Sequence, residues 1–164
     1  MQLVVKNGFL INQNQKFKCS IGYNGLIKNK SEGDGCTPIG TFEINKILYR
    51  PDKINNNKFK IESEIIDHND GWCDDVDSDL YNQKIRFPFK KSAEQLYRND
   101  DLYDIICIIN YNLNPIIRGR GSAIFLHVAR DDYAPTQGCI AVRKDELLQI
   151  ALNLERDTTI LIDP

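Results

Sequence analysis

The stretch IFLHVARDDYAPTQGCIAV, residues 124–142, carries the strongest structural and chemical signal in the sequence. An almost continuously apolar run at its start predicts a buried strand over residues 123–129, with His127 close to the end of that strand. A polar loop follows, and the chain returns to apolar residues directly after Cys139. The stretch therefore predicts a histidine held at the rim of a sheet and a loop that folds back to bring a cysteine beside it.

A cysteine beside a histidine is the pair that nucleophilic catalysis by a thiol requires. The thiolate is the nucleophile, but a thiol is mostly protonated at neutral pH, so a nearby imidazole has to take its proton. Gly138 leaves space for a substrate carbonyl, and the backbone amides of Gly138 and Cys139 are candidates for an oxyanion hole. The pattern predicts acyl transfer with Cys139 as the nucleophile and His127 as its base.

Two other interpretations of this pair stay open. In one, His127 is a core histidine with satisfied hydrogen bonds and Cys139 is a small buried apolar residue. In the other, Cys73 joins them as a metal ligand, although the three residues lack the regular spacing of a zinc site. Because this spacing is missing, we expect no metal, and no other cofactor is expected. Cys107, within the apolar run IICII, is expected in the core.

Outward from this stretch, short apolar or alternating segments separated by Gly, Asn and Pro predict a succession of strands. The expected strands cover residues 3–6, 9–12, 17–21, 40–49, 104–111, 123–129 and 158–162. Apolar residues at helical spacing predict one clear helix over residues 145–154, and a shorter helix is expected over residues 92–98. Many strands with few helices favour a single, mainly β domain over residues 1–164, built as a mixed sheet or a sandwich.

Charge and hydropathy narrow the classes of partner. The 164 residues carry a formal net charge of -2, which gives no reason to expect binding to nucleic acid. No run of about 18 apolar residues occurs, so no membrane span is expected. The first residues lack the pattern of a secretory signal peptide. We therefore expect a cytoplasmic protein, or a periplasmic one if a leader has been removed.

The stretch around Cys139 resembles the signature of the L,D-transpeptidase (YkuD-type) family. In that signature a His is followed, after a short loop, by Ser/Thr-His-Gly-Cys-Ile/Val-Arg. The matching residues here are His127, Thr136, Gly138, Cys139 and Ile140. Residues 32–42, EGDGCTPIGTF, resemble a second block of the family, and residues 119–124 resemble the lead-in strand of one of its subfamilies.

Two positions depart from the family signature. Gln137 stands where the family has its second His, and Ala141 stands where it has the Arg that helps to organise the site. Neither position is the nucleophile or the base, so the core chemistry is expected to survive. The arginines that could take over from the missing one are Arg120, Arg130 and Arg143.

The resemblance implies a YkuD-type β-sandwich that acts on peptidoglycan stem peptides. Cys139 would attack the carbonyl between meso-diaminopimelate and the terminal D-Ala, and an acyl-thioester would form as D-Ala leaves. His127 would be oriented by the backbone carbonyl of Val128. An amine acceptor would make the enzyme an L,D-transpeptidase, and water would make it an L,D-carboxypeptidase. Hydrolysis would suit a cytoplasmic enzyme that recycles muropeptides.

The resemblance also implies which residues contact the substrate, a peptidoglycan tetrapeptide or muropeptide. The segment 71–75 would lie over the cleft and would meet a cationic or zwitterionic peptide. The expected substrate-binding residues are Thr136, Gln137, Trp72, Asp74, Asp75, Arg120 and Arg130. Loss of the family's Arg and second His favours one alternative of another class, a catalytically degenerate domain that binds peptidoglycan fragments. A further alternative is thiol redox sensing by Cys139 with Cys73, which requires the two thiols to lie close together.

Overall fold

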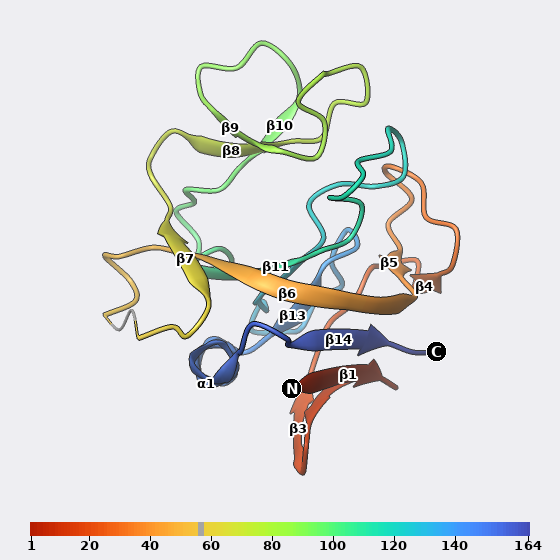
Figure 1. The fold of residues 1–164 in the computed structure, drawn as a ribbon, viewed down its shortest axis with the longest axis vertical. Helices are drawn as coiled ribbons and strands as arrows, with labels where there is room; N and C mark the ends of the chain where they lie inside the picture. The colour runs from red at the N-terminus through yellow and green to blue at the C-terminus, as the bar shows by residue number, and fades with distance from the viewer. Residues whose placement is uncertain (56–57) are drawn as a thin grey trace.

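The long strand β6 (Gly40–Tyr49) crosses the middle of the fold and organises the main sheet (Figure 1). The structure is a computed structural model that describes residues 1–55 and 58–164. The first half of β6 pairs with β14 (Thr159–Ile162), and its second half pairs with β11 (Ile105–Ile109). One strand thereby joins the end of the chain to the part of the sheet that carries the histidine and the cysteine.

The main sheet is mixed. Its other strands are β1 (Gln2–Lys6), β2 (Phe9–Asn12), β3 (Gln15–Lys18), β7 (Glu62–Ile65), β12 (Phe125–Val128) and β13 (Ile140–Val142). Within the described residues they follow the order β13-β12-β11-β6-β14-β1-β2-β3, with β7 beside β6. The pairs β1–β14, β6–β7 and β12–β13 are parallel, whereas β11 is antiparallel to both of its neighbours. The predicted fold class, mainly β with a mixed sheet, is confirmed.

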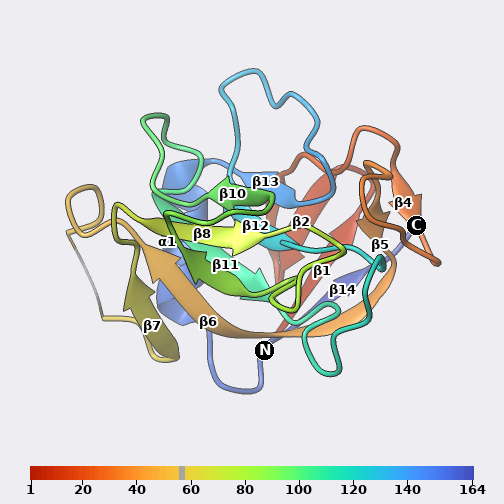
Figure 2. The same ribbon diagram turned by 90° about the horizontal axis from the view of Figure 1, so that it is seen from above.

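A second, smaller sheet covers one face of the main sheet. It consists of β8 (Asp70–Cys73), β9 (Lys84–Arg86) and β10 (Ala93–Gln95), with β8 in the middle. Seen from above, β8 and β10 lie over β11 and β12 (Figure 2). Between the two layers lies an apolar cluster that includes Trp72, Leu96, Ile106, Ile108 and Phe125. A two-stranded sheet of β4 (Leu26–Ile27) and β5 (Thr37–Pro38) lies outside this sandwich.

The opposite face of β11 and β12 packs into the main core. Successive side chains of a strand point to opposite faces of the sheet, so Cys107 and Leu126 enter this core while Ile106, Ile108 and Phe125 enter the other cluster. Helix α1 (Lys144–Asn153) closes the main core with Leu147 and Ile150, one residue away from the bounds expected from the sequence. No helix in the described part of the chain is long and apolar enough to cross a membrane.

Two local predictions are wrong. The helix expected over residues 92–98 is absent, and Ala93–Gln95 instead forms β10, paired antiparallel with β8. The segment 71–75, expected to be a loop, contributes most of β8. All four residues of β8 are buried, so this strand shows no alternation of apolar and polar residues that the sequence could reveal. Pairing between the two segments overrides the weak local preference of each.

Candidate active site

The parallel pair β12–β13 brings His127 and Cys139 to one cavity. In this pair Leu126 lies opposite Ile140 and His127 lies opposite Ala141. Cys139 directly precedes β13, so the pairing of the two strands brings both residues close together. Both side chains line a cavity of about 430 Å³ between the small sheet and the edge of the main sheet. The two residues that the sequence singles out therefore lie in the same site.

The Cys139 thiol is partly buried, and its surroundings favour the protonated form. Its Sγ–H donates to the carbonyl oxygen of Ala123 at 3.0 Å, and the amide of Phe125 donates to Sγ at 3.4 Å. Burial raises the pKa of the thiol to about 12 and Glu94 adds to the rise, while the Phe125 amide and the charge of Lys30 oppose it. Among the described residues, no hydrogen bond joins Sγ to the imidazole of His127.

The imidazole of His127 is held in one orientation. Its Nδ1 lies 2.8 Å from the carbonyl oxygen of Val128, so Nδ1 carries the proton and Nε2 is left as the basic nitrogen. Only 6% of the residue is exposed. Burial lowers the pKa of His127 to about 4 even though the Val128 carbonyl opposes this shift. The free protein thus pairs a neutral imidazole with a neutral thiol. The predicted contact with Val128 is present, and its catalytic role stays a prediction.

The turn before Cys139 is braced by Thr136. Its Oγ1 accepts a hydrogen bond from the Gly138 amide at 3.1 Å and donates to the Cys139 carbonyl at 2.6 Å. The Gly138 amide, predicted as an oxyanion donor, is therefore already engaged, and Thr136 acts on the turn. The Cys139 amide has no hydrogen-bond partner among the residues described. Gly138 itself has φ +139, and a Cβ there would come within 2.8 Å of the Cys36 carbonyl oxygen.

Three of the other predicted substrate-binding residues line the cavity. They are Asp74, Arg130 and Gln137. The Asp74 Oδ1 atom is buried and has no hydrogen-bond partner among the described residues. An unpaired carboxylate oxygen beside a cavity is a ready acceptor for a donor on a ligand.

Trp72 and Asp75 do not line the cavity. Trp72 is a core residue: its Nε1 donates to Asn82 Oδ1 at 2.9 Å, and its ring packs edge-on against Phe125 with the centroids 5.1 Å apart. The carboxylate of Asp75 accepts hydrogen bonds from the backbone amides of Asp77 and Ser92, so it stabilises a turn. Trp72 therefore supports the site from behind Phe125, and the expectation that it forms a wall of the cleft is wrong.

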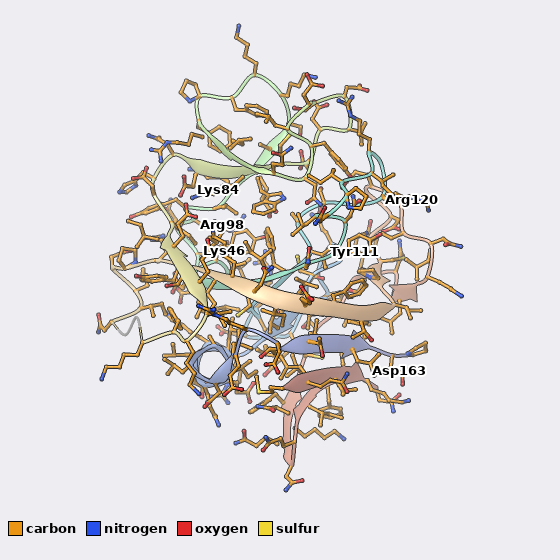
Figure 3. All side chains as sticks on the ribbon, in the orientation of Figure 1. Lys46, Lys84, Arg98, Tyr111, Arg120 and Asp163 are labelled. Carbon is orange, nitrogen blue, oxygen red and sulfur yellow. The ribbon has the colours of Figure 1, made fainter. Side chains whose placement is uncertain are left out.

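The three arginines named from the sequence also differ in whether they line the cavity. Arg130 lines the cavity, whereas Arg143 pairs with Asp145 at 2.8 Å at the start of α1. Arg120 is not among the residues that line the cavity, and Figure 3 shows it on the opposite side of the view from Arg98, which does line it. Of the three arginines named from the sequence, Arg130 alone reaches the site.

Sequence reasoning missed Lys30, Glu94 and Tyr103, which also line the cavity. The Tyr103 hydroxyl donates to Glu94 Oε1 at 2.6 Å, and its ring meets the His127 ring edge-on at 5.2 Å. Burial raises the pKa of Glu94, and this effect outweighs the opposing hydrogen bond from Tyr103. The one local signal that could have identified Lys30 as a cavity residue is its position two residues before the EGDG block. Glu94 and Tyr103 have no such signal.

The cavity carries charges of both signs. Lys30, Arg98 and Arg130 supply positive charge, and the carboxylates come from Glu32, Asp74 and Glu94. A cavity of this size and polarity suits a peptide end that bears both an ammonium and a carboxylate group. Within the described residues, no group of three or more His, Cys, Asp or Glu side chains could hold a metal ion.

Comparison with known families agrees with this geometry. A family model described as the YkuD L,D-transpeptidase catalytic domain matches residues 1–162, almost the whole chain. A search of curated proteins found no match. The matched region contains every residue that lines the cavity.

Proposed function

The chain belongs to the YkuD family of L,D-transpeptidase catalytic domains, which act on peptidoglycan peptides, and we propose that it transfers acyl groups through a thioester on Cys139. The observation that carries the proposal is the common cavity of Cys139 and His127, with the imidazole fixed by the Val128 carbonyl. The scissile bond would be the one between meso-diaminopimelate and the terminal D-Ala of a stem peptide.

In each half of the proposed reaction, His127 takes up one proton and then gives it on. The thiol proton passes from Sγ of Cys139 to Nε2 of His127 as the sulfur attacks the substrate carbonyl. When the tetrahedral intermediate collapses, the carbon–nitrogen bond breaks and His127 gives this proton to the departing amine of D-Ala. The acceptor then loses a proton to His127 and attacks the thioester, and the thiol takes that proton back.

Proton transfer is uphill in the free protein. The thiol pKa is about 12 and the imidazole pKa is about 4, so an ion pair between them is not populated near neutral pH. The thiolate therefore forms only as attack on the carbonyl proceeds. Glu94 is the second cause of the high thiol pKa, after burial. A substrate ammonium beside Glu94 would cancel that charge and favour the thiolate.

Asp74 and Glu94 are the proposed partners of the substrate ammonium. Both line the cavity, Asp74 has a buried oxygen without a partner among the described residues, and Tyr103 fixes the Glu94 carboxylate. Diaminopimelate carries an ammonium group on its free D-centre, where a simple aliphatic residue would carry none. Acids on this wall would therefore select stem peptides with a cationic side chain.

The acyl acceptor decides which reaction the enzyme performs. Hydrolysis of soluble muropeptides suits the cytoplasmic location expected from the sequence, and cross-linking suits a location outside the cytoplasm. The test is incubation with a disaccharide-tetrapeptide, with and without an amine acceptor, followed by mass spectrometry. Loss of one D-Ala without a linked product identifies an L,D-carboxypeptidase. A linked product identifies an L,D-transpeptidase.

One observation favours a second candidate, a domain that binds peptidoglycan fragments without turnover. Ala141 lines the cavity where the signature has an Arg, so the site lacks that charge. A carbapenem distinguishes the two candidates because its strained carbonyl acylates an active nucleophile. Stoichiometric labelling of Cys139 supports the enzyme. A protein that binds the tetrapeptide but is neither acylated nor able to cleave it would be the binding domain.

A further inference from the structure

Lys30 is a buried lysine in the wall of the cavity beside the nucleophile. The residue is 3% exposed. Its side chain passes over Gly121, where a Cβ would lie 2.7 Å from Lys30 Cε, and its Nζ lies 3.4 Å from the Cβ position of Gly138. The ammonium group therefore sits next to the residue that precedes Cys139. Glycine at position 121 leaves the path open for this side chain.

Asp34 fixes the ammonium group. Nζ donates to Asp34 Oδ1 at 2.6 Å, and the same carboxylate accepts hydrogen bonds from the amides of Ser31 at 2.8 Å and Cys36 at 2.9 Å. Burial opposes ionisation of Asp34, but the hydrogen bonds from Lys30, Ser31 and Cys36 outweigh it and lower the pKa. These hydrogen bonds favour the charged form of Asp34, and its ion pair holds the Lys30 side chain in place.

Lys30 keeps hydrogen-bonding capacity for a ligand. An ammonium group has three hydrogens, and within the described part of the chain Asp34 is its sole hydrogen-bond partner. Burying a charge with unused donors is unfavourable unless something in the cavity uses them. The group that could use them is an anionic oxygen next to Cys139.

The backbone of the turn before Cys139 offers fewer oxyanion donors than the sequence predicts. The Gly138 amide is engaged by Thr136, so the Cys139 amide is the backbone donor that remains in this turn. The carbonyl oxygen of a substrate attacked by Cys139 becomes an oxyanion, and preorganised donors at that point lower the barrier. Lys30 Nζ lies 3.4 Å from the Cβ position of Gly138, and Lys30 lines the same cavity as Cys139. Arg130, the arginine named from the sequence that lines the cavity, is exposed.

We propose that Lys30 is a further catalytic residue, whose ammonium group stabilises the oxyanion formed when Cys139 attacks the substrate carbonyl. This inference rests on the proposed thioester chemistry. The lysine takes no part in proton transfer: its ammonium group donates to the developing oxyanion and releases it when the carbonyl reforms. The Cys139 amide is the second donor.

The test compares two reactions of the same thiol. Acylation by a carbapenem passes through an oxyanion, whereas alkylation by iodoacetamide displaces iodide and forms none. Lys30→Met keeps the length of the stem and removes the charge. It should slow acylation and kcat on the tetrapeptide by about 100-fold, the usual loss for one oxyanion donor. Alkylation should slow by less than about tenfold, because the charge has only an indirect effect on the thiol.

Two further variants keep the test decisive. Lys30→Met/Asp34→Asn removes both charges, so it avoids leaving the Asp34 carboxylate without its ammonium partner if the single variant folds poorly. Lys28→Met, at an exposed lysine two residues away, is the matched control and should react at the wild-type rate. Unchanged acylation in a folded variant, or equal losses in acylation and alkylation, overturns the role of Lys30. A wild-type protein that is never acylated refutes the proposed function instead.

Discussion

Cys107 is buried in the main core, whereas Cys139 lies partly buried in the wall of the cavity. Burial raises the pKa of each to about 12, and for Cys107 it is the sole cause. Around Cys139 a carboxylate, a buried ammonium and a backbone amide also act on the sulfur. Burial alone makes a thiol inert. A thiol becomes useful for catalysis when groups near it can change its charge state as a substrate arrives.

The surroundings of the two thiols differ because the main core and the cavity lie on different sides of the sheet. Cys107 belongs to the main core, in which Leu126 and Val128 of the neighbouring strand also pack. His127, between those two residues in sequence, points to the other face and lines the cavity. Because side chains alternate between the two faces of the sheet, neighbouring residues of β12 lie either in the core or at the cavity.

The largest expected effect is that of Cys139→Ala. Removing the nucleophile should lower turnover of a tetrapeptide by at least about 1,000-fold, because no other group can form the thioester. The thermal midpoint should change little, since the thiol lies at the edge of the cavity. Mass spectrometry of the reaction and a thermal melt measure both effects. Wild-type turnover by this variant would refute the central assignment.

His127 should make stability depend on pH. Its pKa is about 4 in the folded protein against the ordinary histidine value of 6.5, so the unfolded chain binds the proton more tightly. The contribution is fully present above pH 6.5 and is lost as pH falls toward 4, up to about 3 kcal/mol of the free energy of unfolding. Urea unfolding at several pH values measures it. His127→Gln should remove this slope, and His68→Gln should retain it.

Cys107→Ser is the counterpart on the other face. A hydroxyl buried without a partner should lower the free energy of unfolding by about 1 to 3 kcal/mol. The folded fraction should keep wild-type kcat, because Cys107 is remote from the cavity chemistry. Chemical denaturation and titration of the active fraction with a carbapenem separate the two effects. A fall in kcat of the folded protein would contradict this division between the two faces.

Asp74→Asn should have the smallest effect. The amide keeps the size of the side chain but loses the charge that pairs with a substrate ammonium, so KM should rise by about tenfold while kcat falls less. Asp75→Asn is the matched control, because Asp75 stabilises a turn outside the cavity. Steady-state kinetics on the tetrapeptide test both. Equal KM values for the two variants would remove Asp74 from the ammonium site.

Local sequence predicted the elements whose own pattern is strong. Strands β2 and β6 have the expected bounds, since their residues and flanking turns carry the signal. Strand β10 was expected to be helical and β8 to be a loop, because each is defined by its partner across the small sheet. The identity of Cys139 and His127 as a pair followed from one short stretch. Lys30 and Glu94 reach them only through folding, from about 100 and 40 residues away in sequence.

The connection between β12 and β13 is anchored independently at its two ends. The Ala129 amide donates to the Val142 carbonyl at 2.7 Å, and Thr136 exchanges hydrogen bonds with the backbone of Ile21 and Tyr23, each at 2.9 Å. Changes in the length or composition of residues 130–135 are therefore expected to have little effect on the positions of His127 and Cys139. If the proposed function holds, grafting this span between relatives is expected to alter which acceptors reach the thioester while Cys139 and His127 keep their positions.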